Sequence, residues 1–342
     1  MVDERLLDAA RAGDEGAFAR LVEPHRRALH AHCYRMLGSV ADAEDALQDA
    51  LLNAWRGLAK FEGRSSLRSW LYTIATNACL RAIERRPKRV LPIDYAPAAD
   101  PHDGLAEPLV ESVWVEPYPD EAVGLEDGPA GPEARYEQRE SVELAFIAAL
   151  QHLPARQRAV LILRDVLGFS ARETAATLET SPPAVDSALQ RAHKAVDERL
   201  PERSQQAMLR SLDDQGQREI VDRYVDAFER NDVDAVVEML AVDGAFTMPP
   251  VPTWYRGREA VAEFLSGHVL AGDKRWRLIP ARANGQLAFG NYRWDEARSM
   301  FEPRSLSVLT LGQEGIAEIT TFIDLAPEMM RRFGLPDEVP SG

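Results

Sequence analysis

The sequence has little cysteine and no long apolar run, and each shortage excludes a class of protein. Only Cys33 and Cys79 occur among 342 residues, too few for the disulfide framework of a small secreted domain. No signal-peptide pattern opens the chain, so we expect a reducing, cytoplasmic location. No run of about 18 apolar residues is present, so we expect no membrane-spanning helix and no membrane partner.

Positive charge is also scarce overall, because the formal net charge is −15. The cations are nevertheless concentrated, with nine basic and two acidic residues between Arg56 and Arg89. From Leu91 to Glu140 the balance reverses to thirteen acidic and two basic residues, with eight prolines. A local surplus of cations acts where it is concentrated, and an acidic, proline-rich stretch is typical of a linker.

Hydrophobic periodicity divides the chain into four parts and predicts a multidomain fold. Residues 1–90 and 136–204 have the apolar spacing of helices, so each is expected to form an all-α domain. Residues 91–135 lack periodicity and are expected to be mostly extended. Residues 215–342 combine helical segments with β-branched and aromatic runs between glycine turns, which predicts an α+β domain with an antiparallel sheet.

The second helical part contains a helix-turn-helix pattern. Ser170 can cap one helix, and Ser181 can cap a second helix that has two prolines in its first turn. Val185, Leu189 and Val196 then face inward, which leaves a polar face free to enter a DNA groove. By itself this pattern fits an ordinary helical hairpin equally well.

The residues before this pattern connect it to a family. In "LQHLPARQRAVLILRDVLGFSARETAATL" the Leu-Pro, Gln-Arg and Gly-Phe-Ser elements resemble the promoter-proximal domain (region 4) of bacterial sigma factors. The resemblance implies that this domain reads the −35 promoter element. The residues it assigns to that contact are Ser170, Arg172, Ser181, Pro183, Ala184, Asp186, Ser187, Gln190, Arg191 and Lys194.

The first helical part has its own resemblance, carried by "DAEDALQDALLNAWRGLAKFEGRSSLRSWLYTIATNACLRAIERR". It looks like the promoter-melting domain (region 2) of the extracytoplasmic function (ECF) sigma factors. The resemblance implies that an acidic helix docks on the clamp helices of the largest RNA polymerase subunit, through Asp42, Glu44, Asp45, Gln48, Asp49 and Trp55. It assigns −10 element contacts to Phe61, Arg64, Ser65, Trp70, Thr73, Asn77, Arg81, Arg85 and Arg86.

His30, His32 and Cys33 lie close together in the sequence, but their spacing on a helix does not make all three converge. We therefore expect packing and no metal site. A sigma factor needs no cofactor, so none is expected.

The linker contains one apolar island, "VESVWVEPYPDE", whose Trp114 and Tyr118 are not typical of a disordered chain. We expect it to dock on a partner or on the third domain. By resemblance to sigma factor linkers, it is also expected to follow the RNA path of the polymerase, with region 4 on the flap of the second subunit.

Residues 217–336 resemble the SnoaL-like branch of the NTF2-like fold, in which helices close a curved sheet into a cone. The candidate pocket residues are Tyr224, Asp243, Trp254, Tyr255, His268 and Asp324. A carboxylate in an apolar pocket can act as a general base, but sequence spacing does not show a catalytic geometry.

Together these patterns predict a promoter-specificity subunit of the ECF type that is not an enzyme. Its SnoaL-like domain is expected to regulate it by contacting the sigma domains or the linker. Two alternatives remain: a SnoaL-like isomerase or hydrolase tethered to a DNA-binding carrier, and a stand-alone helix-turn-helix repressor that does not use polymerase.

Overall fold

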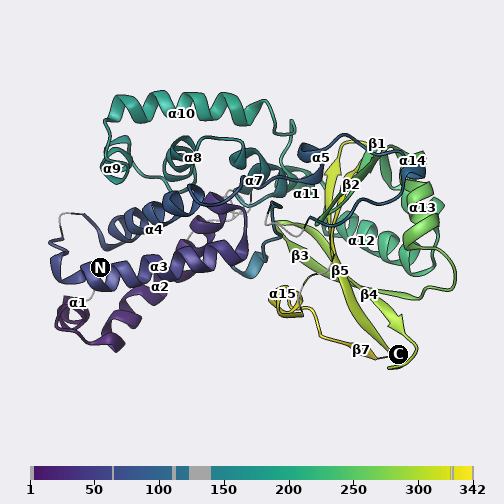
Figure 1. Cartoon of the computed structure of the whole chain (residues 1–342), viewed down its shortest axis with the longest axis horizontal. Coiled ribbons are helices and arrows are strands. Elements are labelled where there is room, and N and C mark those ends of the chain that lie inside the picture. Colours follow the sequence, from purple (N-terminus) through teal and green to yellow (C-terminus); the bar gives the residue numbers. More distant parts are fainter. Residues whose placement is uncertain are drawn as a thin grey trace. The chain divides into compact units, whose positions relative to one another are not determined.

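The computed structural model describes residues 4–63, 65–109, 113–122, 140–323, 325 and 327–340. These residues form two compact units (Figure 1). The first unit contains an N-terminal helical domain (residues up to 89) and a helix-turn-helix domain (residues 140–201). The second unit contains the linker (residues 90–120) together with the C-terminal fused domain (residues 202–340).

The N-terminal helical domain has four helices around an apolar core. They are α1 (Glu4–Arg11), α2 (Glu15–Leu37), α3 (Val40–Gly57) and α4 (Leu67–Ile83), with a 3-10 turn at Leu58–Lys60. Helix α3 begins at Ser39, whose hydroxyl accepts a hydrogen bond from the Asp42 amide. Helices α2, α3 and α4 pack on one another, and both cysteines lie buried as free thiols.

The helix-turn-helix domain follows the predicted pattern closely. Its helices are α7 (Leu144–Gln151), α8 (Ala155–Leu161) with a π-helical extension (Ile162–Val166), α9 (Ala171–Thr177) and α10 (Pro182–Asp197). Ser170 forms a capping box with Glu173 at the start of α9, and the Ser181 hydroxyl caps α10. Buried Val185 and Val196 attach α10 to the domain, while the long helix extends along its edge (Figure 1).

The fused domain is a curved, mostly antiparallel sheet covered on one face by helices. The strand order is β2-β1-β6-β5-β4-β3, with β1 and β6 parallel. The strands are β1 (Leu240–Met248), β2 (Val251–Arg256), β3 (Trp276–Ala283), β4 (Gln286–Asp295), β5 (Met300–Gly312), β6 (Gly315–Ile323) and the short β7 (Val339–Pro340) on β5. This α+β architecture confirms the fold class predicted from the sequence.

Helices close the inner face of that sheet into a core. Side chains of α12 (Asp214–Glu229), α13 (Val233–Glu238) and α14 (Arg258–Phe264) pack against inward-facing residues of β1 to β6. The other helices of this unit are the linker helix α5 (Pro92–Tyr95), α11 (Gln205–Ser211), α15 (Pro327–Arg332) and the short turns at Pro101–Asp103, Asp120–Ala122 and Leu265–Val269.

Helix α11 is attached to the sheet through a glutamine side chain. Gln205 Nε2 donates to the Leu311 carbonyl at 2.9 Å, while the Leu311 amide donates to Gln205 Oε1 at 2.6 Å. Within the described part of the chain, no helix is long and apolar enough to cross a membrane.

Candidate nucleic-acid interface

The predicted −35 residues form an exposed face on the helix-turn-helix domain. Ala184, Asp186, Ser187, Gln190, Arg191 and Lys194 are all exposed on α10. Ser170, Arg172, Ser181 and Pro183 are also exposed at the starts of α9 and α10. Asp186 lies in the second turn of α10, beyond the first turn in which the helix dipole favours a carboxylate.

The predicted −10 residues divide into an accessible group and a packed group. Ser65, Arg81, Arg85 and Arg86 are exposed, and Asn77 is half-buried. Phe61 is buried, with its ring centroid 4.9 Å from that of Trp70, and the Arg11 side chain donates to the Phe61 carbonyl. Arg64 lies outside the described residues.

The acidic helix α3 presents three of its six predicted polymerase contacts fully to solvent. Asp45, Gln48 and Asp49 are exposed, Glu44 is half-buried, and Trp55 packs against Phe18 with centroids 5.1 Å apart. Asp42 differs from its neighbours because it is buried and its carboxylate forms ion pairs with Arg86 and Arg89. Of the predicted contacts, Asp45, Gln48 and Asp49 are therefore the ones fully exposed on α3.

The helix-turn-helix domain packs directly on helix α4, which carries the −10 residues. The Thr73 hydroxyl lies 3.0 Å from that of Thr177 on α9. Arg68 of α4 donates to the Leu167 carbonyl at 3.1 Å, and its guanidinium lies 4.9 Å from the centroid of Phe169. One predicted −10 residue, Thr73, is thus occupied by the helix-turn-helix domain.

A second contact between the two domains closes the C-terminal end of α2. Arg158 of α8 donates to the Met36 carbonyl, and Gln151 Nε2 donates to the Arg35 carbonyl at 3.3 Å. Gly38 ends α2 with a φ of 70°, and a Cβ there would lie 3.1 Å from the Gln151 side chain. The end of the helix, which has unpaired carbonyls and a partial negative charge, is therefore capped by residues of the other domain.

The linker docks on the fused domain, one of the two alternatives predicted for it. Trp114 and Tyr118 are buried, at 6% and 0% exposure. The Tyr118 amide donates to Asn284 Oδ1 and the Asn284 amide donates to the Tyr118 carbonyl, both at 2.8 Å. Trp254 Nε1 donates to the Ala96 carbonyl at 2.7 Å.

The candidate pocket residues of the fused domain do not share one cavity. Tyr224 and Tyr255 are buried in the core between sheet and helices. Neighbouring residues of a strand point to opposite faces of the sheet, so the Trp254 side chain points away from the core that contains Tyr255. It packs against the linker. Asp243 and His268 are exposed, and Asp324 lies outside the described residues.

The sequence interpretation missed a polar cluster within the core of the fused domain. Asn291 Nδ2 donates to the hydroxyls of Ser305 and Ser307 at 2.9 and 2.8 Å, and Ser307 lies 2.9 Å from the Thr321 hydroxyl. Burial raises the pKa of the Tyr224 phenol, which lies near Ser307 of this cluster. The members of the cluster come from three strands, and no local pattern marks them.

No group of three or more metal-ligating side chains is present among the described residues. His32 is buried with its Nε2 2.9 Å from the Thr76 hydroxyl, and its ring contacts Tyr72. Burial, with a smaller contribution from Arg35, lowers the pKa of His32 to about 3, so the imidazole is neutral.

Three family models match the chain, and together they cover most of it. Sigma-70 region 2 matches residues 21–89, Sigma-70 region 4 matches residues 143–196, and the SnoaL-like domain matches residues 221–320.

Curated relatives and a solved structure agree with these models. The ECF RNA polymerase sigma factor SigG of Mycobacterium tuberculosis is 42% identical over 328 residues, covering 95% of this chain and 85% of the relative. SigM of the same organism is 32% identical over 190 residues, covering 56% of this chain and 80% of the relative. The crystal structure of the Mycobacterium tuberculosis ECF sigma factor SigJ has a TM-score of 0.54 at 23% identity, covering 91% and 97% of the two chains, and shows a shared fold.

Proposed function

This chain belongs to the ECF group of RNA polymerase sigma factors, and we propose that its two sigma domains are held in a closed, inactive arrangement until polymerase or a signal separates them. The N-terminal helical domain corresponds to region 2 and the helix-turn-helix domain to region 4, because the two family models match these parts of the chain. Sigma factors bind core RNA polymerase and promoter DNA. The SnoaL-like fused domain has a regulatory role in this proposal, with no catalytic step assigned to it.

We assign the site roles from exposure as well as from resemblance. The face formed by Asp45, Gln48 and Asp49 binds the clamp helices of the largest subunit, and the helix-turn-helix domain rests on the flap of the second subunit. Gln190 reads a base and Arg191 holds a phosphate, because amide and guanidinium groups suit those two partners. Arg81 and Arg85 hold backbone phosphates beside the −10 element.

The distance between the two promoter elements carries the closed-state proposal. The −10 and −35 elements lie about 25 base pairs apart, which is about 85 Å of B-form DNA at 3.4 Å per base pair. In the structure, Thr73 of region 2 and Thr177 of region 4 are in hydrogen-bond contact at 3.0 Å. One chain in this arrangement cannot place each domain on its own element, so the two domains must separate before transcription begins.

The fused domain restrains that separation by holding the linker. Residues on both sides of region 4 are attached to the same β3–β4 turn, because Asp120 accepts from the Gly285 amide at 2.7 Å and Gln206 donates to the Gly285 carbonyl. While they stay docked, the linker residues up to Asp120 add no length to the connection between regions 2 and 4. Release of the linker therefore accompanies opening, and the fused domain acts as an intramolecular inhibitor.

A reversible disulfide tests the closed state. We would replace both contacting threonines, Thr73→Cys and Thr177→Cys, because their hydroxyl oxygens lie 3.0 Å apart and an S–S bond of about 2.05 Å needs only a small adjustment. Oxidation is expected to abolish promoter-dependent transcription with core polymerase, and reduction is expected to restore it.

The single variant Thr177→Cys is the matched control, because it cannot form the bond. Native Cys33 and Cys79 are buried and do not compete for the new thiols. If the oxidised double variant transcribes as well as the reduced one, regions 2 and 4 work while in contact and the closed-state proposal is wrong.

A further inference from the structure

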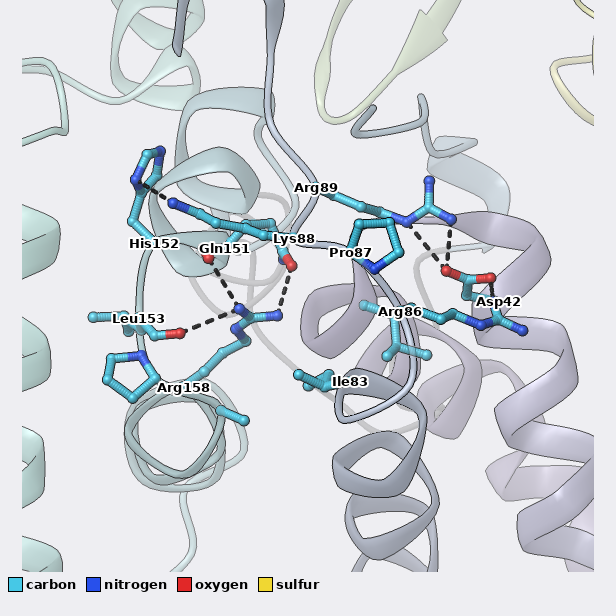
Figure 2. A pocket seen from close by; sticks show the side chains of 13 residues that line it. Asp42, Ile83, Arg86, Pro87, Lys88, Arg89, Gln151, His152, Leu153 and Arg158 are labelled. Atoms are coloured by element: carbon cyan, nitrogen blue, oxygen red, sulfur yellow. Dashed lines mark hydrogen bonds and ion pairs between the residues drawn. The ribbon is translucent and has the colours of Figure 1, made fainter. Parts of the chain in front are cut away.

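A cavity of about 400 Å³ lies within the first unit, where the end of α4 meets the turn between α7 and α8 (Figure 2). Its walls come from both sigma domains. Region 2 contributes Asp42 and the segment through Arg86, Lys88 and Arg89, while region 4 contributes the segment from Gln151 to Arg158. A cavity of this size is within the range of about 300–1,000 Å³ that small ligands occupy.

Cations outnumber carboxylates among the lining residues. Arg86, Lys88, Arg89 and Arg158 face the cavity, whereas Asp42 is the one carboxylate that lines it. Arg86 and Arg89 share the Asp42 carboxylate, as Figure 2 shows. Lys88 Nζ lies 2.7 Å from His152 Nδ1, an imidazole nitrogen of region 4.

Arg89 and Arg158 are both at 5% exposure, but among the described residues only Arg89 pairs with a carboxylate, that of Asp42, so the more unusual cation is Arg158. Its guanidinium is bound by uncharged oxygens: the carbonyls of Met36, Gln151 and Leu153 and the Gln151 side chain. No carboxylate of the described residues forms an ion pair with it, and its Nε is buried without a hydrogen-bond partner among them. Burial lowers the pKa of Arg158 to about 10, so the group is still charged at neutral pH.

We propose that this cavity binds a small phosphorylated anion, which bridges Arg158 of region 4 and the Arg86–Lys88 segment of region 2. The terminal N–H groups of Arg158 already donate to protein oxygens, so Arg158 contributes its charge to the site. The exposed Arg86 and Lys88 supply the hydrogen bonds to the phosphate oxygens. A bound phosphate would compensate the buried cation of Arg158, whose desolvation is costly while it is bound to neutral oxygens alone.

The anion would favour the closed sigma factor, since its ligands come from both domains and separate when the domains open. A ligand that binds only one of two states shifts their ratio by one plus its concentration divided by its dissociation constant. At 100 times its dissociation constant, it lowers the ratio of open to closed chain by about 100-fold. The site thus allows a phosphorylated metabolite to repress the sigma factor, in a way that rests on the closed state proposed above.

Isothermal titration of the full chain with inorganic pyrophosphate tests the site directly. Pyrophosphate is expected to bind the wild-type chain more tightly than sulfate does at equal ionic strength. Lys88→Gln is expected to weaken pyrophosphate binding about tenfold, the effect of losing one charge-assisted hydrogen bond. Lys60→Gln is the matched control, because Lys60 is an exposed lysine of region 2 outside the cavity, and it is expected to bind like wild type.

Three results would overturn the proposal. The first is equal pyrophosphate affinity in wild type and Lys88→Gln, or no binding at millimolar concentration. The second is an equal loss of affinity for a non-promoter DNA duplex in Lys88→Gln, which would mean that these cations serve the DNA backbone. The third is that saturating pyrophosphate leaves the affinity of the wild-type chain for core polymerase unchanged. That result would mean that the bound anion does not favour the closed state, and the disulfide test would still report on the closed state by itself.

Discussion

At the scale of single residues, Glu318 shows how the linker and the sheet depend on one another. It lies on β6 beside Thr247 and Thr320, whose hydroxyls donate to its carboxylate at 3.1 and 3.0 Å. Burial raises the pKa of Glu318, with a smaller contribution in the same direction from Asp94 of the linker helix, while Arg256 and the two hydroxyls act in the opposite direction. The carboxyl therefore keeps its proton to a higher pH in the folded chain than in the unfolded chain.

We predict that Glu318→Gln stabilises the fused domain at neutral pH. The raised pKa means that the folded chain binds more protons than the unfolded chain between the ordinary pKa and the folded one, so wild-type stability falls as pH rises through that window. Glutamine removes the titration and keeps a hydrogen-bonding group. The difference in apparent melting temperature between variant and wild type should grow as pH rises from about 4 to about 8.

Glu314→Gln is the control for that experiment, since Glu314 is exposed in the turn next to β6. It should show no such dependence on pH. A Glu318→Gln chain that parallels wild type at every pH would mean that this carboxyl is hydrated in the folded state.

Two residues of the recognition helix are expected to respond differently to alanine substitution. Gln190→Ala should cost about 1–3 kcal/mol of holoenzyme binding to the cognate promoter and relax the base preference at one −35 position. Arg191→Ala should weaken binding to all sequences alike and reduce the salt slope by about 1. Competition binding with single-base promoter variants distinguishes them, and equal losses on every sequence for Gln190→Ala would contradict its assignment as a base reader.

At the scale of elements, the linker and the β3–β4 turn form one structural unit. Asn284 and Gly285 are the two residues of a tight hairpin, and both have positive φ, at 55° and 70°. Asparagine and glycine are the residues that favour this turn. The same asparagine side chain accepts the Tyr118 amide, so the turn both joins two strands and holds the linker.

Asn284→Gly is therefore expected to loosen the linker without disturbing the turn, because glycine also adopts positive φ. Loss of one hydrogen bond costs about 1 kcal/mol, which is roughly fivefold in the local opening equilibrium. Hydrogen–deuterium exchange at Tyr118 should quicken by that factor, and affinity for core polymerase should rise.

Asn231→Gly is a closely matched control. Asn231 also has positive φ, at 55°, and its side chain donates to the Lys274 carbonyl at 2.8 Å, within the fused domain. Faster exchange at Tyr118 in Asn231→Gly as well would mean that the effect is a general loss of stability.

The elements that the sequence predicts well are those marked by local chemistry. Ser170 and Ser181 each cap the helix that they were expected to begin, because capping depends on residues a few positions apart. The long-range contacts had no such signal: Thr73 and Thr177 are 104 positions apart, and Arg158 and Met36 are 122 apart.

The pocket of the fused domain was predicted less well than its fold. Trp254 and Tyr255 were both assigned to one pocket, although adjacent residues of a strand point to opposite faces. Tyr255 faces the core, and Trp254 packs against the linker. The alternation rule would have separated them once β2 was recognised, but its Pro252 and short length conceal the strand in the sequence.

At the scale of the whole molecule, the charge distribution agrees with a protein that depends on polymerase for DNA binding. The net charge of −15 opposes approach to DNA at long range, while the recognition helix carries two acids and two cations among its exposed residues. Regions 2 and 4 can add their affinities only when both reach the duplex, which the closed chain prevents. Polymerase therefore supplies the geometry that the free chain lacks.

This leads to a prediction about the chain with and without core polymerase. Linking two binding modules in the correct geometry raises overall affinity by about 100- to 10,000-fold. We expect the free chain to bind a duplex with both elements no more tightly than a duplex with the −35 element alone, whereas the holoenzyme should prefer the complete promoter by about 100-fold or more. Electrophoretic mobility shifts at about 0.15 M salt would measure the two ratios, and the oxidised Thr73→Cys/Thr177→Cys chain should show no preference even with core present. A free chain that already prefers the complete promoter would mean that the domains separate on DNA alone, without help from polymerase.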